Sequence, residues 1–159
     1  MRVLIDTTFA RRGPTGAGVY AERLVAALRA EGVDVVEAAN ERRRPPAGGG
    51  LGSLRNLASD VLWTEIGLRR RPGDVVHHPL PARITGARRP QVVTVHDLAY
   101  EVLPDACDPR IRACATRAYR RAARRADVVV CGTQATARDL RERWGVERIV
   151  VAPYGPGQE

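Results

Sequence analysis

The chain has 159 residues, a formal net charge of +8 and apolar residues at 44% of its positions. This length suits one domain built around a single hydrophobic core. No apolar run approaches the roughly 20 residues of a membrane-spanning helix, which argues against an integral membrane protein. All 26 basic residues are arginine. The charge is therefore open to three interpretations: a compositional bias, an anionic substrate or membrane surface, or nucleic acid.

The cysteines and the N-terminus bear on the cellular compartment. Cys107, Cys114 and Cys131 are odd in number and contain no C-x-x-C pair, which favours a reducing compartment without a disulfide framework. Cys131 ends an apolar run and is predicted to be a small core residue. The chain opens with the strand-like run Arg2–Asp6 instead of a signal peptide. We therefore expect a soluble, cytoplasmic protein.

Strand-like and helix-like patterns alternate along the chain. Short runs rich in β-branched residues predict strands at 2–6, 33–36, 74–77, 91–96, 127–131 and 148–152. Helical periodicity predicts helices at 19–30, 53–69 and 109–126. This alternation predicts an α/β fold: a Rossmann-like parallel sheet with helices on both faces and right-handed crossovers. The domain should span residues 1–152, interrupted by a mobile Arg-, Pro- and Gly-rich loop at 39–52.

The helix predicted at 109–126 has two contrasting faces. Its apolar residues fall within an arc of roughly 100° on a helical wheel, and they are Ile111, Ala115, Ala118, Tyr119, Ala122 and Ala126. The opposite side carries Arg110, Arg117, Arg120, Arg121, Arg124 and Arg125. The small inner residues suit close packing against a sheet. The arginines are either an ordinary solvated face or a peripheral contact with an anionic membrane, here the inner face of the cell membrane.

Several polar or glycine-containing features follow predicted strands. Three histidines lie there, His77 and His78 after the third strand and His96 after the fourth, where Asp97 adjoins it. The turn Thr15–Gly18 follows the first strand and opens a helix. Thr133 follows the fifth strand and is predicted to cap a helix that ends at Gly145. Each feature alone has a purely structural explanation. Because ligands of open parallel sheets bind at the carboxyl ends of the strands, their shared placement favours a ligand site.

The glycine turn and the histidines permit further interpretations. Gly16 and Gly18 would let a ligand approach the backbone closely, with helix amides directed at an anion. The dinucleotide fingerprint G-x-G-x-x-G fails at Ala21, although Glu37 could bind a ribose. A P-loop is excluded because the chain has no lysine. A metal site formed by His77, His78, His96 and Asp97 stays open, but their spacing matches no recognised zinc pattern.

The order of motifs resembles the N-terminal domain of a GT-B fold glycosyltransferase of family 4, also called group 1. The matching segments are T15-G-A-G-V-Y20, D74-V-V-H-H-P79, V92-V-T-V-H-D-L98, Y119-R-R-A-A-R-R-A-D-V-V-V-C-G-T133, A137-R-D-L140 and R148-I-V-V-A-P-Y-G155. They cover most of the chain outside the predicted loop. The resemblance implies one half of a GT-B fold, which uses a nucleotide-sugar donor in a cleft between two Rossmann-like domains.

The resemblance also implies site residues. His96 would reach into the cleft and contact the donor sugar or the acceptor, and Asp97 would orient groups or cap the next turn. We assign these two residues to catalysis. The role expected for His96 is to position the substrate and form a hydrogen bond with it, and we do not assign it as a general base. The predicted substrate-binding residues are Thr15, Gly16, Ala17, Gly18, His77 and Thr133. The resemblance implies retention at the anomeric carbon, and we expect neither a metal nor another cofactor.

Parts of the family pattern are missing. Family members bind most of the donor through a C-terminal domain with a basic pair and a Glu-x7-Glu motif. This chain has no lysine and no two glutamates in that spacing. Residues 153–159 would begin the hinge, with Pro153-Tyr154-Gly155 where members often carry Pro-Asn-Gly. We therefore expect an acceptor-side half that is nearly inactive without a C-terminal domain.

Two other functions stay open at this point. The chain could be a stand-alone α/β module that binds a phosphorylated small molecule without catalysis. It could also bind nucleic acid, although specific nucleic-acid binding is not expected. The arginine-rich helix offers Tyr119 as its aromatic residue, and that residue lies on the apolar face, away from the arginines.

Overall fold

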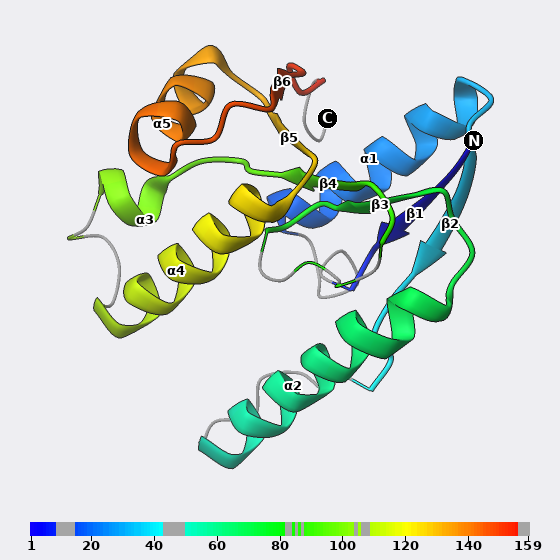
Figure 1. Cartoon of the computed structure of the whole chain (residues 1–159), viewed down its shortest axis with the longest axis horizontal. Helices are drawn as coiled ribbons and strands as arrows, with labels where there is room; N and C mark the ends of the chain where they lie inside the picture. Colours follow the sequence, from blue (N-terminus) through cyan, green and yellow to red (C-terminus); the bar gives the residue numbers. More distant parts are fainter. Residues whose placement is uncertain are drawn as a thin grey trace. The chain divides into compact units, whose positions relative to one another are not determined.

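Figure 1 presents the computed structural model, which describes residues 1–8, 15–42, 50–81, 84, 86, 88–103, 105 and 109–155. Six strands form one open sheet in the order β2-β1-β3-β4-β5-β6. The pairs β1–β2, β4–β5 and β5–β6 are parallel. Along the chain, helices lie between β1 and β2, β2 and β3, β4 and β5, and β5 and β6, whereas within the described residues no helix lies between β3 and β4. The structure therefore confirms the predicted Rossmann-like parallel α/β fold.

The chain forms two compact units, which are described separately. Unit 1 comprises Met1–Val76 and Thr85–Arg89, and unit 2 comprises His77–Ile84 and Pro90–Glu159. Unit 1 contains β1 (Arg2–Asp6), α1 (Gly16–Ala30), β2 (Asp34–Ala38), α2 (Gly50–Leu62), the π-helical turn η2 (Trp63–Gly67) and the 3-10 turn η3 (Leu68–Arg70). Unit 2 contains β4 (Gln91–Thr94), α3 (Ala99–Val102), α4 (Pro109–Arg125), β5 (Val128–Cys131), α5 (Gln134–Trp144) and β6 (Ile149–Val151). Strand β3 (Val75–His78) contributes to both units.

Strand β1 is buried on both faces. Side chains alternate across a strand, so Val3 and Ile5 share one face and Leu4 lies on the other. Val3 and Ile5 pack with Val25 of α1 in one apolar cluster. Leu4 packs in a second cluster with Leu68 of η3. Unit 1 therefore has helical segments on both faces of β1, as predicted.

The helix predicted at 53–69 has different ends in the structure. It begins at Gly50, so the last three residues of the predicted 39–52 loop are helical, while 43–49 lie outside the described residues. The α-helical part ends at Leu62. The chain stays helical through the π-helical turn η2 and the 3-10 turn η3. The Thr64 hydroxyl donates to the carbonyl of Asp60, a contact that often bends a helix. A Cβ at Gly67 would lie 2.3 Å from the Trp63 ring, so glycine permits this close packing.

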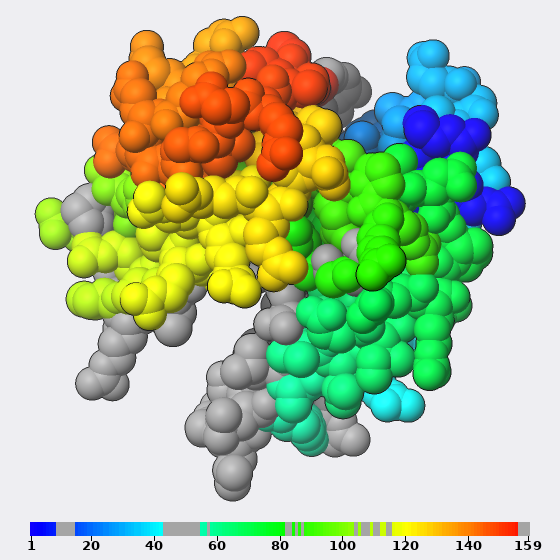
Figure 2. All heavy atoms as spheres, viewed as in Figure 1, coloured from blue at the N-terminus to red at the C-terminus, as the bar shows by residue number. Residues whose placement is uncertain are grey.

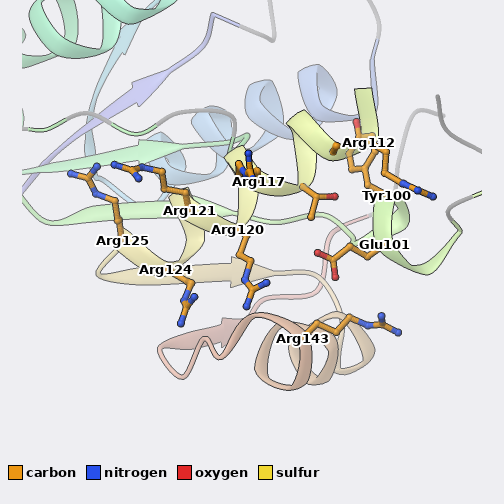
Figure 3. Close-up of a pocket in the computed structure, with 11 residues that line it drawn as sticks. Tyr100, Glu101, Arg112, Arg117, Arg120, Arg121, Arg124, Arg125 and Arg143 are labelled. Atoms are coloured by element: carbon orange, nitrogen blue, oxygen red, sulfur yellow. The ribbon is translucent and has the colours of Figure 1, made fainter. Parts of the chain in front are cut away.

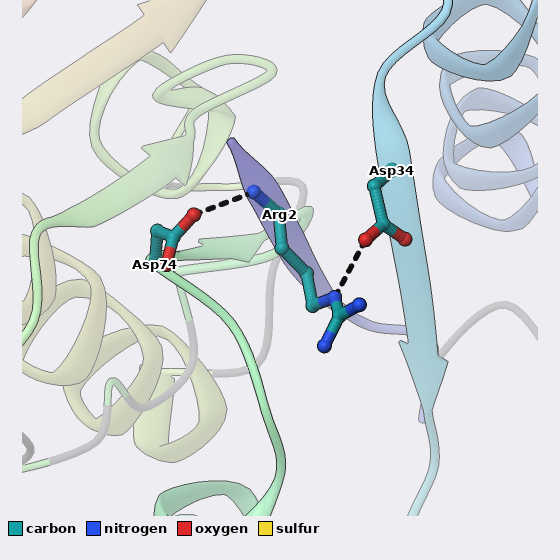
Figure 4. A network of polar contacts seen from close by, with 3 residues as sticks. All are labelled: Arg2, Asp34 and Asp74. Atoms are coloured by element: carbon teal, nitrogen blue, oxygen red, sulfur yellow. Dashed lines mark hydrogen bonds and ion pairs between the residues drawn. The ribbon is translucent and has the colours of Figure 1, made fainter.

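A small polar network fixes the amino ends of the unit 1 strands (Figure 4). The Arg2 guanidinium donates to the Asp34 carboxylate at 2.6 Å, and the Arg2 backbone N–H donates to Asp74 at 2.7 Å. Arg2 and Asp34 are also register partners in the β1–β2 pair. Exposed ion pairs of this kind contribute about 0–1 kcal/mol. The network therefore helps to fix the register of β1 against β2 and adds little to the free energy of unfolding.

Unit 2 has one continuous apolar core. Val93 and Val95 of the β4 segment and Val129 of β5 are fully buried there. Ala122 of α4 and Ala126, directly after the helix, pack in the same cluster, which confirms the apolar face predicted here. Further members are Leu140 and Trp144 of α5. The small alanines let α4 approach the sheet closely.

Cys131 and the ends of α5 agree with the sequence predictions. Cys131 is fully buried in the unit 2 core, while Cys107 and the Cys114 side chain lie outside the described residues. The Thr133 hydroxyl accepts from the Thr136 N–H at 3.1 Å and caps the N-terminus of α5. Gly145 ends the helix with a φ of 65°, the left-handed region that favours glycine. Separately, none of the helices in the described parts of the chain is long and apolar enough to cross a bilayer.

Candidate active site

The predicted site residues belong to different units. Thr15, Gly16, Ala17 and Gly18 lie in unit 1, whereas His77, His96, Asp97 and Thr133 lie in unit 2. Each group is therefore described within its own unit.

His96 follows the carboxyl end of β4 and is half-buried. Strand β4 ends at Thr94, and the Val95 N–H still donates to the Val130 carbonyl of β5 at 2.9 Å. The His96 ring nitrogen Nε2 lies 3.1 Å from the Pro79 carbonyl oxygen. Because a carbonyl only accepts, Nε2 carries the hydrogen and Nδ1 is the acceptor nitrogen of the neutral ring. This bond fixes both the tautomer and the orientation of the imidazole.

The surroundings of His96 favour its neutral form. Burial lowers the pKa of His96, whereas the bond to Pro79 and the charge of Asp97 act in the opposite direction. A neutral imidazole can accept a hydrogen bond at Nδ1 while it donates at Nε2. His96 is therefore suited to orient a hydroxyl group near neutral pH.

Tyr154 is a site residue that sequence reasoning did not select. Its ring meets the His96 ring edge to face, with centroids 5.5 Å apart and planes at 61°. Gly132, directly after β5, lies beneath the same ring, since a Cβ there would be 2.7 Å from a Tyr154 ring carbon. The tyrosine stood out in the sequence as a departure from the family's Pro-Asn-Gly, but its contacts could not be read there. His96, Gly132 and Tyr154, which follow β4, β5 and β6, thus meet in one cluster.

Replacing Tyr154 with alanine is expected to raise the pKa of His96 towards its ordinary value of about 6.5. Burial is the largest cause of the lowered pKa, and removal of the neighbouring ring would admit water. NMR titration of the histidine ring protons measures the change. Tyr119→Phe serves as a matched control, because this tyrosine contacts Tyr100 and not His96. An unchanged His96 titration in Tyr154→Ala would contradict the assigned packing.

Asp97 and Thr133 organise the backbone around His96. Asp97 is exposed, and its carboxylate accepts from the Ala99 N–H at 2.9 Å at the start of α3. It therefore caps a turn, one of the two roles expected for it. Thr133 is also exposed and caps α5, and the Thr136 hydroxyl of the same cap donates to the His96 carbonyl at 3.5 Å. The first turn of α5 thus supports the segment that carries His96.

His77 and His78 lie at the carboxyl end of the third strand, as predicted, but inside it and not beyond it. Both are the last residues of β3 and are buried, with exposed fractions of 7% and 1%. His77 Nε2 shares a hydrogen bond of 2.8 Å with the Thr94 hydroxyl, and His78 Nε2 lies 3.0 Å from Gln91 Oε1. Burial and, to a lesser extent, His78 lower the pKa of His77 to about 4. Parallel strands are buried on both faces, so successive side chains can both be interior.

The segment Thr15–Gly18 opens a helix, as predicted. Gly16, Ala17 and Gly18 form the first turn of α1, and the positive-φ glycines of the described chain are Gly32 and Gly145. The Thr15 hydroxyl accepts from the Gly18 N–H at 3.1 Å as the N-cap. With this cap, Gly16 and Gly18 have ordinary helical backbone angles and not the left-handed conformation that favours glycine. A Cβ at Gly16 would meet nothing within 4 Å, so the space in front of this residue is open.

Replacing Gly16 with valine is expected to weaken substrate use at least roughly tenfold, equivalent to about 1.4 kcal/mol. The branched side chain would occupy the open space in front of the first amides of α1 without disturbing the fold. Steady-state kinetics in a two-domain protein that contains this chain measures the effect. Ala30→Val, at the exposed far end of α1, controls for the lower helix propensity of valine. Equal kinetics of both variants would show that Gly16 serves only the helix.

Asp6 at the carboxyl end of β1 was also not selected from the sequence. Its carboxylate accepts from the Thr8 N–H at 3.1 Å and from the Trp63 indole N–H at 3.3 Å. The Thr8 hydroxyl in turn accepts from the Asn40 N–H at 2.9 Å after β2. These bonds link the carboxyl ends of β1 and β2. The sequence held one sign of this role: Asp6 is a charged residue that ends an apolar strand.

The metal interpretation gains no support in the structure. Within the described ranges, no three His, Cys, Asp or Glu side chains gather in a way that could hold a metal ion. The rings of His77 and His78 instead contact Thr94 and Gln91.

Comparison with known families decides the assignment of the chain. The sequence profile of Glycosyltransferase Family 4 matches residues 14–155. The match covers most of the 159 residues and includes both predicted groups of site residues. The chain belongs to Glycosyltransferase Family 4. No curated protein matches the chain significantly.

Membership of Family 4 confirms the resemblance found in the sequence and supports a glycosyltransferase-type function. The six-stranded Rossmann-like sheet is consistent with an N-terminal domain of a GT-B fold. Within this Family 4 domain, the cluster of His96, Gly132 and Tyr154 lies where ligands of parallel sheets bind, beyond the carboxyl ends of β4, β5 and β6.

Proposed function

We propose that this chain is the acceptor-side, N-terminal domain of a retaining glycosyltransferase that uses a nucleotide-sugar donor. The observation that carries the proposal is the cluster of His96, Gly132 and Tyr154 in a chain matched by Family 4 over residues 14–155. In the reaction, the bond from the anomeric carbon to the nucleoside diphosphate breaks. A bond to an acceptor hydroxyl oxygen forms, and the hydroxyl proton passes to the diphosphate or to solvent.

The proposed roles follow from the local geometry. His96 contacts a sugar or acceptor hydroxyl from its position beyond β4, where the Pro79 carbonyl orients its ring. Asp97 and the first turn of α5 hold the His96 segment in place. Within unit 1, the capped start of α1 presents backbone amides that suit a phosphate group. No protein nucleophile is assigned.

The proposed reaction needs a cytoplasmic donor and a second domain. We place the enzyme in the cytoplasm, where it would use a donor held mainly by a C-terminal domain of the same family. The chain by itself would have no significant transfer activity. The proposal assigns no metal to the reaction, so chelation with EDTA is expected to leave the transfer rate unchanged.

A second candidate is a module that binds a phosphorylated small molecule without catalysis. It is favoured by the start of α1, where Thr15 and Gly16 are exposed and open space surrounds the Gly16 Cα. Helix N-termini of this kind bind phosphate groups through their free amides.

One experiment separates the two candidates. Transfer of labelled sugar from a set of nucleotide-sugars is measured for the chain alone and for a two-domain protein in which a Family 4 C-terminal domain follows residue 155. Binding of the same donors and of sugar phosphates to the chain alone is followed by NMR. We expect transfer only by the two-domain protein, and only weak donor binding by the chain. Tight binding of a phosphorylated compound by the chain, without transfer by the longer protein, would favour the binding module.

A further inference from the structure

The arginine face of α4 forms one wall of a groove in unit 2 (Figure 3). The groove has a volume of about 1050 Å³. It is lined by Tyr100 and Glu101 of α3, by Arg143 of α5, and by Arg112, Ala113, Thr116, Arg117, Arg120, Arg121, Arg124 and Arg125 of α4. We call this feature the arginine groove. In the space-filling view, α4 (yellow) is at the surface of unit 2, next to α5 (orange) (Figure 2).

The positive charge of the arginine groove is poorly balanced within unit 2. Glu101 is the one acidic residue among its lining residues, and its carboxylate accepts from the Trp144 indole N–H at 2.6 Å. Arg143 pairs with Asp139 at 3.6 Å. In the part of the chain that the structure describes, no ion pair joins a lining arginine of α4 to a carboxylate.

The spacing of these arginines places like charges next to each other, which destabilises α4. Arg117, Arg121 and Arg125 are four residues apart in sequence, as are Arg120 and Arg124, so like charges are neighbours on one helix face. Such pairs destabilise a helix unless anions screen them. From Arg112 to Arg125 the row extends over roughly 20 Å of helix. A surface that presents many phosphates matches this length better than one small anion.

The aromatic residue of the arginine groove argues against single-stranded nucleic acid as the ligand. Binding of that kind uses aromatic rings on which bases stack. Tyr100 already meets the Tyr119 ring edge to face, with centroids 5.7 Å apart and planes at 86°. Burial of Tyr119 is also the main cause that raises its pKa to about 12. This pair is thus part of the packing between α3 and α4.

Exposed apolar residues adjoin the groove in the sequence. Val102 and Leu103 directly follow Tyr100 and Glu101 at the end of α3, and their exposed fractions are 46% and 60%. Apolar side chains beside a basic cluster are typical of proteins that lie on a membrane surface, where they enter the interfacial layer. A soluble polyphosphate would make no use of them.

We propose that the arginine groove docks unit 2 on a membrane surface rich in anionic phospholipids. Lipid phosphate groups enter the groove between the arginines, and Val102 and Leu103 insert into the interfacial layer. The attraction is mainly electrostatic, so it weakens as salt shortens the range of the charges. The proposal is independent of sugar transfer, because its test measures only binding.

The test is sedimentation with vesicles of phosphatidylglycerol and phosphatidylcholine at low and high salt. The groove variant carries Arg117→Gln, Arg121→Gln and Arg124→Gln. The matched control carries Arg69→Gln, Arg70→Gln and Arg71→Gln, which removes the same charge from exposed positions of unit 1. At low salt, we expect the groove variant to bind about 10²-fold more weakly than the parent. The control variant should bind within a few-fold of the parent, and pure phosphatidylcholine should bind none of the proteins.

A second variant tests the apolar contact. Val102→Ser with Leu103→Ser should remove most of the binding that persists at high salt while leaving most of the binding at low salt. Circular dichroism of every variant checks that the fold is retained. Equal pelleting of the groove and control variants would overturn the proposal. So would tripolyphosphate or RNA binding to the groove without any pelleting of the parent on anionic vesicles.

Discussion

Replacing His96 with alanine is expected to lower the turnover of a two-domain protein containing this chain by about 10²-fold or more. The imidazole is held at the carboxyl end of β4 by the Pro79 carbonyl and the Tyr154 ring. Loss of the ring removes the group assigned to orient the reacting hydroxyl. The side chain is only half-buried, so water can replace its bond to Pro79 and the fold should remain intact. Steady-state kinetics and thermal unfolding measure the two effects.

His96→Gln separates positioning from proton transfer. A glutamine amide can donate to the Pro79 carbonyl, but it does not titrate. If His96 acts by positioning, the glutamine variant should recover part of the lost rate with an unchanged pH profile. Full loss in both variants would instead indicate a proton-transfer role. Normal turnover in a well-folded His96→Ala protein would leave His96 with a structural role only.

Acidification is expected to destabilise the fold through His77. Burial lowers its pKa from 6.5 to about 4, so in the folded state the ring stays neutral between these values while the unfolded chain binds a proton. The unfolded state is therefore favoured progressively as pH falls from about 6.5 to about 4. The full shift corresponds to a loss of about 3 kcal/mol in the free energy of unfolding. Above pH 7 both states are neutral, and this contribution is constant.

Urea unfolding of the parent and of His77→Gln at pH 7 and pH 4.5 tests this linkage. Glutamine can bond the Thr94 hydroxyl and has no titrating group, so the variant should lose less stability on acidification. The acidic residues titrate in both proteins, and their contribution cancels in the comparison. Equal losses of stability in the two proteins would mean that His77 is accessible to protons in the folded state.

Much of the fold could be predicted because it depends on local patterns. All six strands form within a few residues of their predicted positions, since a buried β-branched run allows few alternatives. The cap at Thr133 and the stop at Gly145 were predicted for the same reason, because capping involves neighbours within a few residues. The two faces of α4 followed from helical periodicity. The resemblance to Family 4 rested on the order of such segments, and the family match confirmed it.

The site was predicted less completely, because strand ends and packing partners are not local properties. The third strand was predicted to end at His77, but it extends through His78, and Thr94 and Gln91 of β4 contact the two buried rings. The helix predicted from residue 19 begins at Gly16, because Thr15 caps its N-terminus. Local pattern cannot decide where a ladder of hydrogen bonds stops, because the partner strand decides it.

The sequence by itself determined the Rossmann-like fold, the family and the position of His96 just beyond the end of a strand. Only the tertiary structure decided that Tyr154 and Gly132 lie against His96, because these residues follow three different strands. It also decided that the arginines of α4 line a groove with Arg143 of α5. Periodicity assigns residues to a face of a helix, but the packing of separate elements in space determines what that face meets.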